Sequence, residues 1–209
     1  MKNVSAGMGV RIGLLSMIFA TGCASQGEVV NLTIPSAPAA NASAAKAEGP
    51  SVSVLRFEDK RANKAWLGTH TGRMGGEERF NIRGNDAGQA VANALTDYLK
   101  SKGWRATAVS DASKANSDVT LSGEILEMDV DAKAGWFLTE LTSKSKVLVQ
   151  GLNRADGSKV RMTLTGTGAD KVFWFNENDA QTLINDVLAE SFSKFPSSTK
   201  FADGGLKLN

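Results

Sequence analysis

Cysteine and histidine are almost absent from this chain of 209 residues, which contains one of each. A single cysteine excludes an internal disulfide. A zinc site is built mainly from cysteine and histidine ligands, so the chain is poorly supplied for such a site. We therefore expect no metal and no cofactor.

A surplus of charge of one sign is also lacking. The chain has 24 Lys+Arg and 22 Asp+Glu residues. Two of the basic residues, Lys2 and Arg11, lie in residues 1–22, which contain no acidic residue, so the remaining chain balances at 22 and 22. Proteins that bind nucleic acid present a basic surface to the phosphates. Nucleic acid is therefore not an expected partner.

The apolar run near the N-terminus is shorter than a membrane span. It extends from Ile12 to Ala20, whereas a spanning helix needs ~20 apolar residues. Basic residues precede this run and small residues follow it, which is the pattern of a secretory signal. Residues 20–23, Ala-Thr-Gly-Cys, also resemble the bacterial lipobox. The alternative is a conventional signal peptide with a cysteine there by chance.

Residues 1–22 are therefore predicted to be a lipoprotein signal peptide, and Cys23 the lipid attachment site. One acyl chain binds a membrane only marginally, but the lipoproteins that this pattern resembles carry several chains on the cysteine. Ala24 and Ser25 lack the aspartate that commonly retains such proteins at the inner membrane. By that resemblance we expect the outer membrane of a Gram-negative bacterium, with the protein facing the periplasm.

The residues after Cys23 predict a tether followed by one domain. Residues 29–35 alternate apolar and polar side chains and would suit an edge strand. The rest of 23–50 is rich in Ala, Pro and Ser and predicts a flexible tether. Residues 51–198 have the size of a single globular domain, and residues 199–209 are predicted to be a loose tail.

Hydrophobic periodicity within this domain predicts an α+β fold. From residue 119 onward, three strands alternate apolar and polar residues, as in an antiparallel sheet covered on one face. The alternation shifts by one residue near Ile125, which indicates a β-bulge. We predict an antiparallel sheet of about four to five strands with two amphipathic helices packed on one face. The predicted strands are 52–57, 105–110, 119–130, 141–149 and 160–166, and the helices are 86–102 and 177–194, the second ended by Pro196.

Two further segments are candidate contact surfaces. Segment 62–85 predicts a long loop that is either mobile or binds a partner. Residues 135–138 predict a turn between the two longest strands, where large aromatic side chains bury poorly and often contact partners. For the run 172–175 before the last helix, core packing is the favoured interpretation. The proposed partner-binding residues are Trp66, Arg73 and Arg79 in the loop, and Trp136 and Phe137 in the turn.

Catalytic motifs are not found. The chain has neither a nucleophile elbow nor a phosphate-binding loop. His70 is the sole histidine and is expected to be solvated. Asp129 and Asp131 share a strand face, but a solvated polar surface is the favoured interpretation. We therefore assign no catalytic residue and expect that the protein is not an enzyme.

The features along the chain together resemble the YajG-like family of bacterial lipoproteins. The resemblance covers most of residues 23–198 and includes the meander and the closing helix. It implies a periplasm-facing domain, tethered to the outer membrane, without known catalysis. The motifs that carry it are the lipobox Cys23, the segment 29–35, Asp59-Lys60-Arg61 at the end of a strand, Ala90 to Leu95 in the first helix, and Lys102-Gly103-Trp104 after it.

Our first functional hypothesis is a non-enzymatic binding or assembly module of the cell envelope. Its partners would be the membrane, through the N-terminal lipid, and another envelope protein. A tether confines such a domain near its partner and raises the effective concentration. The alternative is a carrier or sensor of a small apolar or glycan ligand. An envelope hydrolase is the least favoured hypothesis.

Overall fold

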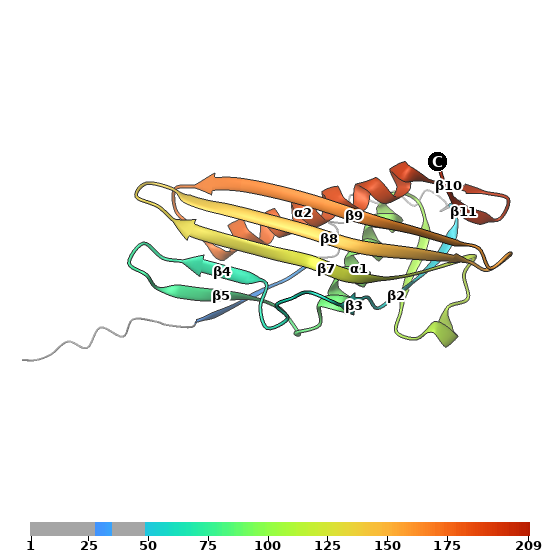
Figure 1. Ribbon diagram of the computed structural model, residues 1–209, viewed down its shortest axis with the longest axis horizontal. Helices are drawn as coiled ribbons and strands as arrows, with labels where there is room; N and C mark the ends of the chain where they lie inside the picture. The colour runs from blue at the N-terminus through green and yellow to red at the C-terminus, as the bar shows by residue number, and fades with distance from the viewer. Residues whose placement is uncertain (1–27, 35–48) are drawn as a thin grey trace, which may run out of the picture.

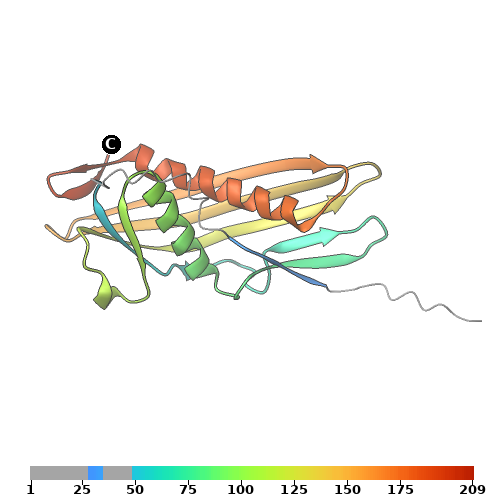
Figure 2. The same cartoon turned by 180° about the vertical axis from the view of Figure 1, so that it is seen from behind.

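The computed structural model describes residues 28–34 and 49–209. Within this part, one mixed sheet of nine strands is covered on one face by two helices (Figures 1 and 2). The predicted signal peptide, Cys23 and most of the predicted tether lie outside the described residues. The sheet contains β1 (Val29–Leu32), β2 (Ser51–Leu55), β3 (Glu58–Asp59), β4 (Gly68–Thr71), β5 (Glu77–Ile82), β6 (Arg105–Val109), β7 (Val119–Ala134), β8 (Thr139–Asn153) and β9 (Lys159–Val172). The remaining elements are α1 (Ala87–Ser101), η1 (Ala112–Lys114), α2 (Glu177–Ser198), β10 (Thr199–Ala202) and β11 (Gly205–Leu208).

Three long strands organise the sheet. β8 pairs antiparallel with β7 on one side and with β9 on the other. The free edge of β7 is shared by three short strands, which are β2, β3 and β4 in order along its length. β6 extends the sheet beyond β2, and β5 and β1 extend it beyond β4. The predicted edge strand in residues 29–35 is confirmed as β1.

The prediction of a four- to five-stranded antiparallel sheet was wrong. The sheet has nine strands, and β1–β5, β2–β6 and the three pairings along the edge of β7 are parallel. Two of the missed strands, β4 and β5, form an antiparallel hairpin inside segment 62–85, which was predicted to be a loop. Glycines and charged residues interrupt the alternation of apolar and polar side chains in β4 and β5. Periodicity also says nothing about which edge a returning strand joins.

The bulge in β7 is confirmed. Ile125 pairs with Val147 and Glu127 with Lys146, so Leu126 is an extra residue with no partner on β8. The bulge changes the sequence parity of the buried positions, and Met128 continues the buried face after Ile125. This is the two-against-one arrangement expected of a β-bulge.

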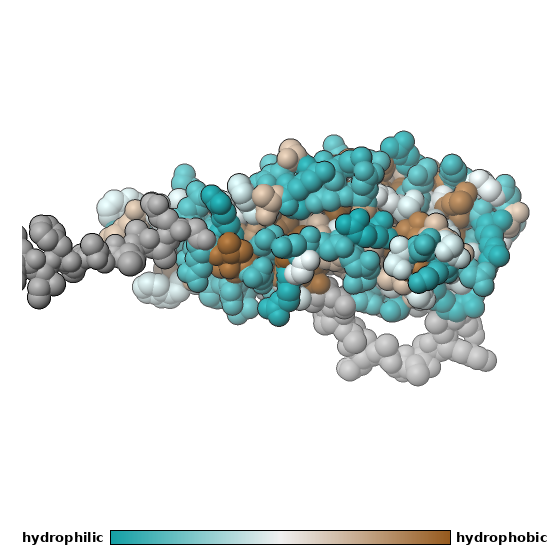
Figure 3. All heavy atoms as spheres, turned by 90° about the horizontal axis from the view of Figure 1, so that it is seen from below, coloured by the Kyte–Doolittle hydropathy of each residue, from teal (hydrophilic) through white to brown (hydrophobic). Residues whose placement is uncertain are grey.

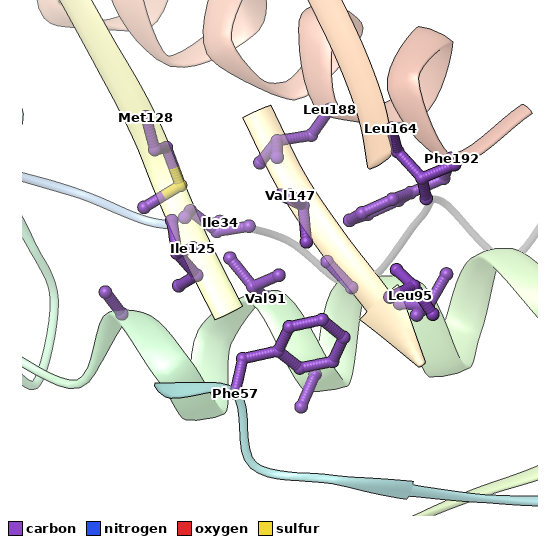
Figure 4. Packing of buried hydrophobic residues seen from close by; sticks show 14 of the residues in the cluster. Ile34, Phe57, Val91, Leu95, Ile125, Met128, Val147, Leu164, Leu188 and Phe192 are labelled. Atoms are coloured by element: carbon purple, nitrogen blue, oxygen red, sulfur yellow. The ribbon is translucent and has the colours of Figure 1, made fainter. Parts of the chain in front are cut away.

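The hydrophobic core lies between the sheet and the helices, while the surface seen from below is mainly hydrophilic with separate hydrophobic patches (Figure 3). In Figure 4, Val91 and Leu95 of α1 point toward Phe57 and the sheet, and Phe192 of α2 lies near Leu164. The predicted N-terminus of α1 is confirmed, because the Asp86 side chain accepts a hydrogen bond from the Gln89 N–H at 2.9 Å. Gly103 ends this helix with φ +83°, where only glycine avoids strain.

α2 approaches the sheet closely at Gly166 of β9. A Cβ atom on this glycine would lie 2.3 Å from the carbonyl oxygen of Val187, so a larger residue cannot fit without moving the helix. Pro196 lies inside the helix and does not end it, contrary to the prediction. The hydroxyls of Ser197 and Thr199 donate to the carbonyls of Ser193 and Phe195, which satisfies acceptors in the last turn.

The C-terminal residues are not a loose tail. β10 and β11 form an antiparallel hairpin. The buried Asn153 amide donates to the Leu206 carbonyl at 2.8 Å and accepts from the Leu206 N–H at 2.7 Å. Leu206 itself is 1 % exposed. The prediction failed because it used only the polar composition of the segment, whereas the hairpin buries Leu206 and bonds to the Asn153 amide.

Candidate functional site

A groove of about 570 Å³ opens on the face of the sheet that the helices leave uncovered. Segment 60–67 leaves the edge of β7 after β3 and returns to it at β4. The Lys60 N–H donates to the Ile125 carbonyl before this excursion, and the Val130 N–H donates to the Leu67 carbonyl at its end. The groove lies between this segment and the polar side of β7 and β8. It is lined by Arg61, Ala62, Asn63, Trp66, Leu67, Leu126, Glu127, Met128, Asp129, Asp131, Thr142, Lys144 and Lys146.

Carboxylates and ammonium groups face each other along the groove. Glu127 on β7 is in register with Lys146 on β8, and Asp129 is in register with Lys144. Side chains at opposed positions lie close enough to interact. Among the described residues, however, neither pair closes to an ion pair within 4.0 Å. These groups can therefore bind donors and acceptors of a ligand.

Asp129 is the carboxylate most affected by its surroundings. Partial burial raises the pKa of the Asp129 carboxyl above its ordinary value, and the negative charges of Glu127 and Asp131 raise it further. Lys144 opposes this shift without cancelling it. Asp131 is held differently, because it accepts a hydrogen bond from the Thr69 N–H at 2.8 Å. Asp129 is half-buried in the groove and Asp131 is exposed, so the predicted solvated face describes Asp131 better than Asp129.

Arg61 separates the groove from a smaller cavity of about 270 Å³. Its guanidinium is 6 % exposed and donates twice to the Asp59 carboxylate, at 3.0 and 2.8 Å. Burial acts to raise the pKa of Asp59, but the hydrogen bonds and the charge of Arg61 outweigh it, so this pKa lies below its ordinary value. The pair fixes the start of segment 60–67 and is a structural part of the groove wall.

Trp66, in the same segment 60–67, adds an aromatic ring to the wall of the groove. The guanidinium of Arg79 lies 4.5 Å from the centre of the Trp66 ring. Arginine over an aromatic face is attracted by the ring quadrupole, so Arg79 holds the ring in place. The half-buried ring lines the groove.

A second feature, here named the aromatic end, consists of Met74, Trp136, Phe137, Phe173 and Trp174. These side chains are 101, 77, 84, 75 and 90 % exposed. They come from three connections, 72–76, 135–138 and 173–176, that meet at one end of the sheet (Figure 1). The guanidinium of Arg73 lies 4.3 Å from the centre of the Trp136 ring and joins two of the connections. Large apolar side chains gathered on a surface mark an interaction site.

Comparison with known proteins gives only distant structural likeness. No protein-family model matches the sequence, and a search of curated proteins finds no match. A crystal structure of a protein described only as uncharacterized has a TM-score of 0.45 and 10 % identity, covering 81 % of this chain and 95 % of that one. A crystal structure of a putative neuraminyllactose-binding hemagglutinin homolog from Helicobacter pylori has a TM-score of 0.37 and 11 % identity, covering 72 % of this chain and 87 % of that one. The crystal structure of lipoprotein GNA1162 from Neisseria meningitidis has a TM-score of 0.35 and 10 % identity, covering 66 % of this chain and 95 % of that one. At these TM-scores the likeness carries no argument about function.

The five partner-binding residues proposed from the sequence divide between the two surfaces. Arg73, Trp136 and Phe137 belong to the aromatic end, whereas Trp66 lines the groove with Arg79 behind it. Cys23 lies outside the described residues. The sequence analysis assigned no binding role to Arg61 or to the two lysines of β8, because an arginine after a strand and an alternating lysine pair are common on solvated surfaces.

The run 172–175 and His70 both differ from their predictions. The run 172–175 was predicted to pack in the core, yet Phe173 and Trp174 are exposed. Val172 and Phe175 do pack against the core, and the Phe175 ring centre lies 4.1 Å from that of His70. His70 is not solvated either, because its side chain is 15 % exposed and its Nδ1 lies 3.0 Å from the Glu78 carboxylate. This histidine has a packing role between β4 and β5.

In the part of the chain that the structure describes, no group of three or more His, Cys, Asp or Glu residues is arranged to hold a metal ion. Among the same residues, no helix combines the length and the hydropathy that a membrane-crossing segment requires.

Proposed function

We propose that this protein is a lipid-anchored, non-enzymatic binding module of the bacterial cell envelope, and that the groove beside segment 60–67 binds its partner. The observation that carries the proposal is the set of unpaired charges in the groove. The carboxylates of Glu127 and Asp129 face Lys146 and Lys144 without closing onto them. A polar segment of another envelope protein can bind to both rows at once, beside the fixed ring of Trp66.

The anchor and the location are part of this proposal. The lipobox pattern at Cys23 supports lipidation, and the absence of aspartate at positions 24 and 25 supports the outer membrane. The resemblance to YajG-like lipoproteins supports both. Palmitate labelling in cells tests the anchor, and we expect Cys23→Ser to abolish it. Fractionation of the labelled cells tests the location. Label that persists in the variant contradicts lipidation at Cys23.

Photo-crosslinking in intact cells tests the groove. A photoreactive residue at Asn63, which is exposed and lines the groove, is expected to capture an envelope protein. The control position is Thr163 of β9, which is exposed and outside the groove. Lys144→Glu removes a positive charge from the groove and is expected to reduce capture at position 63. Equal capture at 63 and 163, or none at 63, contradicts the proposal.

A glycan ligand is the second candidate. An aromatic wall next to mixed hydrogen-bonding groups suits a sugar, which has apolar ring faces and many hydroxyls, and the volume is within the range of small-ligand sites. The charged floor does not suit an apolar ligand. Peptidoglycan fragments are therefore expected to raise the melting temperature. Trp66→Ala should reduce that rise, and no rise with the unmodified protein excludes this candidate.

A further inference from the structure

The aromatic end has no packing role in the described part of the protein. Its five side chains project from three turns, and each is at least 75 % exposed. The turns are neighbours, because Thr139 pairs with Val172 and Thr71 with Lys133, which places the strand ends side by side. Their exposure therefore belongs to one continuous end of the molecule and not to separate loops.

The N-terminal chain enters the fold at this same end. β1 runs parallel to β5, with Val29 opposite Arg79, and the Arg79 N–H donates to the Glu28 carbonyl. β5 begins at Glu77, directly after the turn that carries Met74. The first described residue thus lies near the aromatic end, whereas the β10–β11 hairpin lies at the opposite end of the molecule (Figure 1).

The length of the preceding chain limits how far the anchor can lie from this end. Cys23 precedes Val29 by six residues, and six residues span at most about 20 Å. A lipid on Cys23 would therefore hold the aromatic end close to the membrane surface. A bilayer is also the partner that best suits projecting aromatic side chains, because tryptophan and phenylalanine partition into the headgroup region without needing a complementary pocket.

We infer that the aromatic end inserts into the surface of the lipid bilayer, as a second membrane contact beside the N-terminal lipid. This rests on the proposed anchor at Cys23. Two contacts fix the orientation of the domain, which one flexible attachment does not. Arg73, held against Trp136, is placed to contact the phosphates of the headgroups.

Tryptophan quenching by lipids with brominated acyl chains tests this inference. The full-length lipidated protein is reconstituted into vesicles of phosphatidylethanolamine and phosphatidylglycerol. The four tryptophans of the chain allow two matched variants. Trp66→Phe with Trp104→Phe keeps only the reporters at the aromatic end, and brominated lipid is expected to quench its emission. Trp136→Phe with Trp174→Phe keeps only Trp66 in the groove and Trp104, both away from the aromatic end, and brominated lipid should not change its emission.

Further measurements distinguish membrane insertion from a folding defect in the variants and from binding of another protein at the aromatic end. Trp104 is partly packed in the core, so wild type is also compared with Trp136→Phe/Trp174→Phe, in which both changed residues are exposed. Phe173→Ser with Phe137→Ser is expected to reduce quenching of the remaining tryptophans at this end. Phe201→Ser in the opposite hairpin should not. A photoreactive residue at position 137 should yield lipid adducts in cells.

The outcomes separate this inference from the proposed anchor. Palmitate labelling at Cys23 without quenching of Trp136 or Trp174 overturns the inference and leaves the anchor standing. Quenching without labelling overturns the anchor and leaves the membrane contact standing. A protein adduct at position 137 in place of lipid adducts overturns the inference, because the aromatic end would then be an interface with another protein.

Discussion

The two faces of the sheet differ in what their side chains contact, although the same strands form both. On the covered face, β7, β8 and β9 present apolar side chains to the helices, and α2 comes so close that Gly166 leaves no room for a Cβ atom. On the open face, most of the intervening residues are charged or polar, and segment 60–67 lies beside them to form the groove. One face therefore gains stability from contact, while the other keeps polar groups available to a ligand. Four substitutions test this contrast.

The largest effect is expected at the pair that fixes segment 60–67. Asp59→Ala leaves the guanidinium of Arg61, which is 6 % exposed, without its carboxylate. Removing one partner of a buried ion pair costs about 3 kcal/mol. Denaturant unfolding measures this loss. Adding Arg61→Met should recover part of it, and a double variant that is no more stable than Asp59→Ala contradicts the explanation.

The covered face should respond somewhat less strongly. Gly166→Ala places a methyl group 2.3 Å from the Val187 carbonyl oxygen, and forcing extra volume into a packed core costs ~1–3 kcal/mol. Gly76→Ala is the control, because no heavy atom lies within 4 Å of a Cβ at that position. Thermal unfolding of the two variants compares them. Equal melting temperatures would mean that α2 shifts freely.

On the open face we expect a smaller change in stability, and in the opposite direction. The pKa of Asp129 is raised, so its ionised form destabilises the folded state. Asp129→Asn should therefore increase stability at pH 7, by less than about 1 kcal/mol. As the pH falls through the folded-state pKa to below the ordinary value of 3.8, Asp129 itself becomes protonated and the difference should disappear. A gain that persists unchanged at low pH contradicts this cause.

The smallest effect on stability is expected at the aromatic end, which belongs to neither face. Trp174 is 90 % exposed, and substitutions at such positions change stability by about 0.5 kcal/mol or less. Trp174→Ser should therefore leave the melting temperature of the protein unchanged in detergent. A clear drop would show that this side chain packs against the domain.

The contrast also explains how much of the structure the sequence could predict. Apolar periodicity predicted both helices, the three long strands and the bulge, because burial on one face repeats at a fixed spacing. β4 and β5 were missed because their glycines and charges hide that spacing. The groove could not be predicted at all, since Arg61 and Trp66 meet Asp129 and Lys144 only through the pairing of β3 and β4 with the edge of β7. In the Val172–Phe175 run, the prediction of core packing was wrong for Phe173 and Trp174, because hydropathy does not say where a strand ends.

The single unpaired residue in β7 has a consequence for how such a site can arise. Leu126 lies where the edge of β7 passes from β3 to segment 60–67, and the Met128 carbonyl just beyond it accepts from Arg61 at 3.5 Å. Deleting Leu126 would keep every later residue on its present face, because the bulge already absorbs the extra position. One residue inserted at such a bulge can therefore change an exposed strand edge while the buried side chains of the strand stay on the covered face. Leu126 itself lines the groove.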